Sequence, residues 1–295
     1  MALSATGYVW AYVANARRVA NDFEGADTAF AQAWALWRAG AGSEPEPLYE
    51  WQLLDLEASL RRAQQRFSEA LELLDRAATT CGGSKIAARN ILLQKEHILS
   101  RMGDFQGALA VLEEAAPLIE REREPRLFFV LQFNRADNLV HLGRYAEAAE
   151  LLPEVREVAV QQANELDLVR VLWLEAKIAS GQGDHRKAAT ALGQVLRDFT
   201  AHGLPYDAAL SSLDLALLWL EDGRTAEVRA LAIGMAWIFT SKKIHREALA
   251  ALALFCEAAQ RDAGTADLAR SVIAQIEEVR RSAPRPQARG RLQNA

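Results

Sequence analysis

Three histidines, His97, His141 and His185, follow one another at intervals of 44 residues, and imidazole nitrogens are common zinc ligands. An internal repeat of 40 residues, described below, runs through the same part of the chain. Because the two intervals differ, the histidines should fall in the middle of a helix, at a helix end and in a turn. We therefore expect that they do not meet at one metal ion.

The two cysteines, Cys81 and Cys256, lie 175 positions apart. They form neither a CxxC pair nor a disulfide framework, and each stands in an alanine-rich stretch. We interpret both as small buried residues. Together with the histidine spacing, this predicts neither a metal site nor a cofactor.

Motifs of catalysis are absent from the sequence. The Gly181-Gln182-Gly183 segment lacks the next glycine, the lysine and the serine or threonine of a phosphate-binding loop. The chain has no nucleophile elbow and no HExxH motif. The many acidic residues are interpreted as solvated helix faces. We expect a protein that is not an enzyme.

The composition indicates helices nearly throughout. The 295 residues include only 17 glycines and 8 prolines, together about 8% against the roughly 12% of an average chain. Alanine, leucine, glutamate and arginine are abundant and favour helix, which excludes most enzymes built on parallel sheets. The 34 basic and 39 acidic residues leave a net charge of −5, which argues against a general nucleic-acid coat.

The sequence also bears on location. No stretch approaches the roughly 18 uninterrupted apolar residues of a membrane span. The N-terminus lacks the basic start and apolar stretch of a secretory signal, and the chain contains no Asn-x-Ser/Thr sequon. We expect a cytoplasmic protein without a membrane segment.

Four turn signals recur at intervals of 40 residues, at Gly103, Gly143, Gly183 and Gly223. The positions around these glycines keep the same spacing, and all but one of them hold small or apolar residues. Seven positions before them stand Glu96, Ala136, Ala176 and Ala216, and five positions after them stand Ala108, Ala148, Ala188 and Val228. Two earlier units fit with looser spacing, around residues 21–23 and 66–67, and the Pro-rich acidic segment 42–47 between them is expected to be an exposed loop.

Each unit is expected to consist of two amphipathic helices joined by a tight turn, where glycine supplies a positive φ at little cost. The small residues let the two helices approach closely. Because one hairpin cannot bury both of its faces, neighbouring hairpins must stack to complete the core.

This pattern resembles the tetratricopeptide repeat: Trp10, Ala14, Ala26, Phe30 and Ala33 in the first unit match most of it. The 40-residue units are six residues longer than the standard 34, and such elongated repeats are similar to those of bacterial sensor and activator proteins. The resemblance implies an all-α, right-handed α-solenoid of about seven antiparallel helix hairpins over residues 1–281, with a disordered basic tail at 282–295. The hairpins are expected at approximately 5–40, 48–84, 85–122, 125–164, 165–203, 204–242 and 243–281.

In tetratricopeptide arrays the first helices of the hairpins line a concave groove, so the resemblance assigns a partner-binding stripe by position. The stripe mixes amides, charges and aromatic rings, which suit the backbone and side chains of an extended peptide. Its basic members, Arg170 and Lys177, would favour an acidic group. The stripe comprises Asn90, Gln94, His97, Phe133, Asn134, Asp137, Arg170, Trp173 and Lys177.

The equivalent positions of the sixth hairpin are leucines: Leu210, Leu213, Leu217 and Leu220. We expect this leucine face to receive the chain's own last hairpin, and the alternative is another helix. The carboxylate clamp of chaperone-binding members is not matched, so chaperone-tail recognition is not expected.

The two ends of the chain differ from its middle. Four tryptophans, at positions 10, 34, 37 and 51, are either core or part of an exposed surface that binds another copy or an upstream module. From Arg280 onward the chain carries five arginines and no acid. We interpret this tail as a solubilising end, and the alternative is a weak contact with nucleic acid or an acidic partner.

Three functions are compared on this basis. The leading hypothesis is a non-catalytic adaptor that binds a protein or an extended peptide through its groove. The alternative is a regulatory module that senses a peptide or small ligand and controls a transcriptional or signalling output domain. An enzyme is the third and least supported hypothesis.

Overall fold

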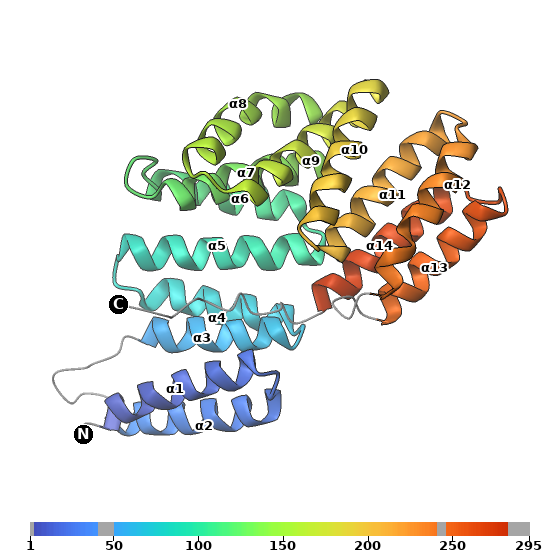
Figure 1. The fold of residues 1–295 in the computed structure, drawn as a ribbon. Coiled ribbons are helices and arrows are strands. Elements are labelled where there is room, and N and C mark those ends of the chain that lie inside the picture. The colour runs from blue at the N-terminus through green and yellow to red at the C-terminus, as the bar shows by residue number, and fades with distance from the viewer. Residues whose placement is uncertain (1–2, 41–49, 241–245, 283–295) are drawn as a thin grey trace, which may run out of the picture. The chain divides into compact units, whose positions relative to one another are not determined.

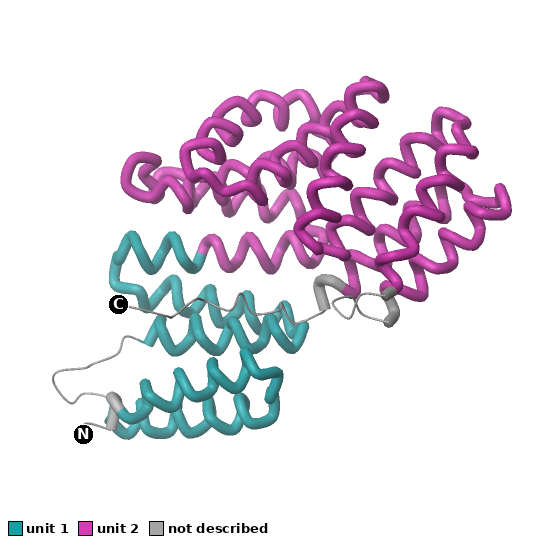
Figure 2. The backbone as a smooth tube through the Cα atoms, viewed as in Figure 1, with its two compact units in different colours: residues 1–91, 282–295 teal, residues 92–281 magenta. Residues whose placement is uncertain are grey.

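A computed structural model of the chain describes residues 3–40, 50–240 and 246–282. Within these ranges the regular structure is helical, with fourteen α-helices, two short 3-10 helices and no strand (Figure 1). The expected loop at 42–47 and the basic tail after residue 282 lie outside the described residues. The chain divides into two compact units, residues 1–91 with 282–295 and residues 92–281 (Figure 2).

Unit 1 contains the first two hairpins. They are formed by α1 (Leu3–Val19) with α2 (Phe23–Gly40), and α3 (Glu50–Ala63) with α4 (Phe67–Thr80). Ala14 of α1 and Ala26 of α2 are completely buried, so the two helices pack closely, as the small residues predict. Phe30 of α2 and Leu53 of α3 belong to the same apolar cluster, which joins the two hairpins.

Unit 2 holds the later hairpins. Helix α5 (Lys85–Met102) enters unit 2 at Leu92, and the helices that follow are α6 (Phe105–Ala115), α7 (Pro125–His141), α8 (Tyr145–Gln161), α9 (Glu165–Gly181), α10 (His185–Ala201), α11 (Pro205–Glu221), α12 (Thr225–Gly234), α13 (Arg246–Gln260) and α14 (Ala266–Ser282). The 3-10 segments Ala116–Leu118 and Met235–Thr240 continue α6 and α12. None of the described helices combines the length and apolarity that a bilayer crossing requires.

A positive φ at the turn is what separates the two helices of each repeat. Gly143 has φ of 71°, and a Cβ atom there would meet nothing within 4 Å, so glycine is required by backbone conformation and not by crowding. The first two hairpins use Asn21 and Gln65 at the same place, both with φ of 62°. This explains why the glycine spacing does not extend to the start of the chain.

The small-residue columns are confirmed in unit 2. Ala136 and Ala176 on first helices are completely buried, as are Ala148 and Ala188 on second helices. Glu96 interrupts the first-helix column and is nevertheless buried, with 4% of its surface exposed. A charged residue therefore stands at a position where the fold otherwise places a methyl group.

In two hairpins of unit 2, an aromatic ring just after the turn contacts the end of the next first helix. The ring of Tyr145, two residues after the turn glycine, packs on Gly181 at the end of α9, where a Cβ atom would lie 2.2 Å from the ring. The ring of Phe105 is stacked on the ring of His141 with centroids 4.2 Å apart. These contacts link neighbouring hairpins along the turn edge of unit 2.

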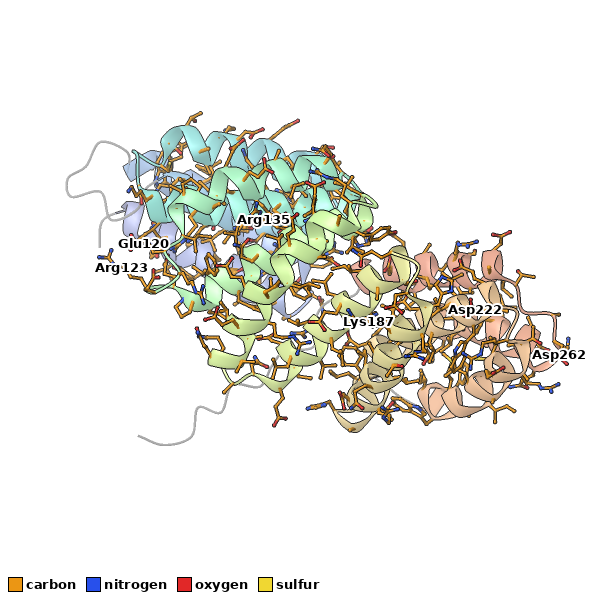
Figure 3. All side chains as sticks on the ribbon, turned by 90° about the horizontal axis from the view of Figure 1, so that it is seen from above. Glu120, Arg123, Arg135, Lys187, Asp222 and Asp262 are labelled. Carbon is orange, nitrogen blue, oxygen red and sulfur yellow. The ribbon has the colours of Figure 1, made fainter. Side chains whose placement is uncertain are left out.

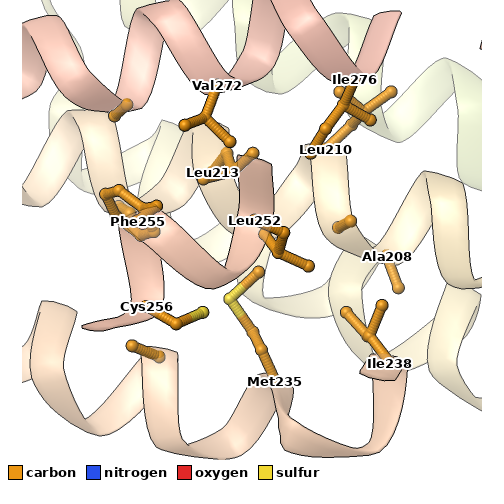
Figure 4. Packing of buried hydrophobic residues seen from close by; sticks show 14 of the residues in the cluster. Ala208, Leu210, Leu213, Met235, Ile238, Leu252, Phe255, Cys256, Val272 and Ile276 are labelled. Atoms are coloured by element: carbon orange, nitrogen blue, oxygen red, sulfur yellow. The ribbon is translucent and has the colours of Figure 1, made fainter. Parts of the chain in front are cut away.

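The last hairpin covers the leucine face, as predicted. Leu210 and Leu213 of α11 are buried in one cluster with Phe255 of α13 and with Val272 and Ile276 of α14 (Figure 4). The start of α14 is tied to the end of α11 by an ion pair of 2.8 Å between Arg270 and Glu221. Helix α14 thus runs along α11 in the opposite direction, and the alternative of another helix is not needed for this face.

Candidate functional site

Unit 2 brings most of the predicted stripe onto adjoining first helices. Helices α7 and α9 are in direct contact, and α5 reaches α7 through side-chain hydrogen bonds. We call the surface formed by α7, α9 and the part of α5 from Leu92 onward the first-helix face. Asn90 lies in unit 1, where Arg89 Nε donates to its Oδ1 over 3.4 Å, so it is described apart from the other eight residues. Gln94 and His97 on α5 are half-buried, and each has an interaction partner.

Glu96 lies at the centre of a polar cluster that the sequence did not predict. Asn134 Nδ2 donates to Glu96 Oε2 over 3.0 Å, and Asn138 Nδ2 donates to Oε1 over 3.3 Å. Ser100 Oγ lies 3.0 Å from both Glu96 Oε1 and Asn138 Oδ1, and its single hydrogen serves one acceptor at a time. Burial raises the pKa of Glu96, and the hydrogen bonds from Ser100, Asn138 and Asn134 oppose that rise.

The cluster includes one residue of the predicted stripe. The amide of Asn134 is predicted to pair with a peptide backbone, and in the structure one of its N–H groups donates to the buried carboxyl of Glu96. Replacing Asn134 would therefore disturb the fold as well as any ligand. The sequence signal for the cluster was the glutamate in the alanine column.

On α9 the indole of Trp173 is held in a fixed orientation. Trp173 Nε1 donates to Asp214 Oδ2 of α11 over 2.7 Å, and the ring meets Phe199 edge-on with centroids 5.4 Å apart. Lys177 Nζ lies over the indole, 4.7 Å from its centroid. Burial raises the pKa of Asp214, and the positive charge of Lys177 and the bond from Trp173 oppose the rise. Asp214 was not predicted, because it lies among the leucines of the sixth hairpin.

Arg170 and Lys177, the basic members of the stripe, have different surroundings. Arg170 Nη1 donates to Asp167 Oδ1 over 3.1 Å, and Arg126 Nη1 binds the other oxygen of the same carboxylate. The side chain of Asp167 is 1% exposed. Arg126 of α7 is therefore a basic neighbour of Arg170, and the predicted stripe included neither Arg126 nor Asp167.

Phe133 and Asp137 lie between these clusters on α7. The ring of Phe133 is half-buried, 5.7 Å from the ring of Phe129. Asp137 Oδ2 lies 3.8 Å from His141 Nε2, and its side chain is 39% exposed. The stripe is thus partly used by the fold and partly open to solvent.

The three evenly spaced histidines have separate surroundings. His141 stacks on Phe105, whereas His185 Nδ1 lies 2.6 Å from Asp222 Oδ1 at the turn edge, where Figure 3 labels Asp222. The bond to Asp222 raises the pKa of His185. Within the described ranges there is no group of three histidine, cysteine or acidic residues that could hold a metal ion.

The N-terminal tryptophans are half-buried, but α1 itself exposes apolar side chains. Val9 and Tyr12 are both 50% exposed. Val9 and Ala16 stand at the positions that α3 fills with Leu53 and Leu60, which are fully buried. The first hairpin thus presents the surface that the second hairpin buries. Docking of another copy or an upstream module at this end stays a prediction.

Three solved structures show where this architecture occurs. The chain aligns with a signal-transduction ATPase with numerous domains that carries a tetratricopeptide repeat sensor, from Pyrococcus horikoshii, at 14% identity and a TM-score of 0.68; the match covers 92% of this chain and 42% of that one. It aligns with the apo form of RapI at 12% identity and a TM-score of 0.70, covering 94% and 98%. It aligns with a Rap protein complexed with competence and sporulation factor at 11% identity and a TM-score of 0.61, covering 94% and 88%.

These likenesses, together with the helix order, confirm the predicted fold: a TPR-like repeat fold in an all-α solenoid. The chain spans less than half the length of the Pyrococcus horikoshii ATPase. No protein-family model and no curated protein matches the sequence.

Proposed function

We propose that the protein is a non-catalytic adaptor that binds an extended peptide or a protein segment along its first-helix face. The observation that carries this proposal is the fixed arrangement of polar and aromatic groups on α7 and α9. Trp173 is oriented by Asp214 and covered by Lys177, while Arg170 is oriented by Asp167. Groups held in one orientation before binding lose little conformational entropy when a ligand arrives.

The chemistry of the face suits a peptide. The side chains of Arg170 and Asp137 are 41% and 39% exposed, so one positively and one negatively charged group are available for hydrogen bonds. The half-buried ring of Phe133 adds an apolar contact between them. Alternating polar and apolar contacts over one face match an extended backbone with side chains on both sides. A relative of the same fold was solved in complex with competence and sporulation factor, which supports a ligand-binding role.

Peptide capture tests the proposal. Immobilised protein is incubated with a library of random nonapeptides, and the retained peptides are quantified by mass spectrometry. The variant Asp137→Lys with Lys177→Gln should reduce retention at least about tenfold, a loss of about 1.4 kcal/mol. The matched control, Glu150→Lys with Arg186→Gln, makes the same charge changes at exposed residues of α8 and α10 and should retain as much as wild type. Equal retention by all three proteins would contradict the proposal.

A second proposal is a sensor that passes ligand binding to an output domain. It is supported by the likeness to an ATPase whose repeats are described as a sensor and of which this chain covers 42%. A sensor must change its conformational equilibrium when ligand binds, whereas an adaptor need not. Small-angle scattering of the peptide-loaded protein separates the two: a changed radius of gyration favours the sensor, and an unchanged one favours the adaptor.

We also propose a cytoplasmic location. Both cysteines are free thiols, and free thiols are typical of a reducing compartment.

A further inference from the structure

Two arginines of the first-helix face share a single buried carboxylate. Arg126 Nη1 binds Asp167 Oδ2, and Arg170 Nη1 binds Asp167 Oδ1. Asp167 is 1% exposed, while the guanidinium side chains of Arg126 and Arg170 are 51% and 41% exposed. The trio carries one net positive charge, held at the adjoining starts of α7 and α9.

Both guanidiniums have N–H donors that are not bonded to Asp167. Among the described residues, Arg126 and Arg170 make no hydrogen bond or ion pair other than those to Asp167. A guanidinium carries five N–H donors in a fixed fork, so most donors of both side chains have no acceptor among the described residues. Asp167 fixes the two forks in place without neutralising them both.

In two other arginine networks of the protein, one arginine binds two carboxylates, whereas at Asp167 two arginines bind one. Arg61 in unit 1 serves two carboxylates, those of Asp27 and Glu57. Arg121 in unit 2 also serves two, those of Glu154 and Glu157. In these networks the positive charge is fully compensated, as a purely structural ion pair requires. At Asp167, one negative charge compensates only one of the two positive charges.

Aromatic rings adjoin the pair of arginines. The Arg126 guanidinium carbon lies 5.2 Å from the ring centroid of Phe129, which in turn packs near Phe133. Arg170 is one helical turn before Trp173 on α9. An anionic group bound between the arginines would therefore place the rest of its chain beside apolar surface.

From this arrangement we infer that Arg126 and Arg170, positioned by Asp167, form a carboxylate-binding site that anchors an acidic peptide on the first-helix face. The inference rests on the proposed function and names the ligand's chemistry. Paired forks bind a carboxylate through two parallel N–H···O bonds, which are among the strong hydrogen bonds of proteins. The carboxylate belongs either to the peptide's C-terminus or to an Asp or Glu side chain.

Four nonapeptide libraries test the inference. The first is random with a free C-terminus, the second is random with an amidated C-terminus, the third lacks Asp and Glu but has a free C-terminus, and the fourth lacks both kinds of carboxylate. Wild-type protein should retain the first library at least about tenfold more than the fourth, as expected for a charge-assisted bond. Retention of the second identifies a side-chain carboxylate as the anchor, and retention of the third identifies the C-terminus.

Single variants assign the effect to the two arginines. Arg126→Gln and Arg170→Gln each leave the other arginine on Asp167, so the buried charge stays paired. Each should lower the preference for the first library over the fourth by about tenfold. Arg186→Gln, at an exposed residue of α10, removes the same charge elsewhere and should keep the preference. The triple variant Arg126→Gln, Asp167→Asn, Arg170→Gln leaves no buried charge, and circular dichroism checks that it stays helical.

The outcomes are distinct. Wild-type protein that retains the first and fourth libraries equally would overturn the carboxylate site while leaving peptide binding intact. Wild-type protein that retains no library would overturn both proposals. A preference that survives in the triple variant, or that Arg186→Gln also removes, would show that these arginines are not the anchor.

Discussion

Glu96 shows how one residue departs from the repeat without breaking it. Its column is otherwise alanine in the neighbouring hairpins of unit 2, where Ala136 and Ala176 are fully buried. Burying a carboxyl without partners is costly, and the protein meets this requirement with donors from Ser100, Asn134 and Asn138. The sequence could identify the exception, but the partners depend on how α5 and α7 pack.

The raised pKa of Glu96 predicts a pH-dependent stability. The pKa of Glu96 is higher in the folded protein than in the unfolded chain, so folding favours its protonated form. This contribution to stability is fully present below about pH 4, near the pKa of glutamate in the unfolded chain. It is lost as the pH rises through the pKa of the folded protein. Glu96→Gln stays neutral and should lack this loss. The melting temperature of the variant minus that of the wild-type protein should therefore increase as the pH is raised from about 4 to 7.

The control for this prediction is Glu150→Gln, at an exposed residue of α8. It should keep the pH dependence of the wild-type protein. A constant difference in melting temperature between Glu96→Gln and wild type over the same pH range would show that Glu96 does not carry the effect.

Among the secondary-structure elements, the turns could be predicted from the sequence, whereas the polar contacts between helices could not. The glycine spacing placed the turns because a positive φ at Gly143 needs glycine or a residue that tolerates it. The same reasoning cannot find Arg126 with Asp167, because that pair joins two helices through side chains with no repeated spacing. Residues equivalent in the repeat differ in role: Asn134 holds Glu96, whereas Asp214 at the same position of α11 accepts from Trp173.

Two glycine substitutions test the contact between turn and helix end. Gly181→Ala would place a Cβ atom 2.2 Å from the Tyr145 ring, so the ring must move at a cost of about 1–3 kcal/mol. Gly193→Ala, inside α10, would meet only Arg197 Nη1 at 3.7 Å and should stabilise by about 0.5–1 kcal/mol through helix propensity. Urea unfolding measures both free energies. Equal stabilities of the two variants would contradict the packing of Tyr145 on Gly181.

At the scale of the molecule, the repeat pattern predicted the class of fold because each hairpin must bury its faces against a neighbour. It also predicted that the leucine face is covered by the last hairpin, because Leu210 and Leu213 have no polar group that could bind a ligand. In the structure both leucines are buried in one cluster with residues of α14. The stripe was predicted only in part. Sequence position put Arg170 and Trp173 on α9, but the bond from Trp173 to Asp214 of α11 and the bond from Arg126 of α7 to Asp167 depend on how the helices pack.

Local packing predicts that the last hairpin can be loosened without affecting the rest of unit 2. Val272 is 2% exposed in the cluster under α14, so Val272→Asp would bury an unpaired charge and release the helix. Hydrogen exchange should become fast in α14, while α7 and α9 keep their protection, because repeats contact only their neighbours. Gln275→Asp, on the exposed side of α14, should leave exchange unchanged. Loss of protection throughout unit 2 would mean that the hairpins unfold as one body.

Hydrogen exchange, measured on the protein with and without its captured nonapeptides, reports which helices the peptide contacts. We expect bound peptide to slow exchange in α7 and α9, with a smaller effect in the part of α5 from Leu92 onward. Slowed exchange confined to the second helices α6, α8 and α10, or no change in any helix, would contradict binding on the first-helix face.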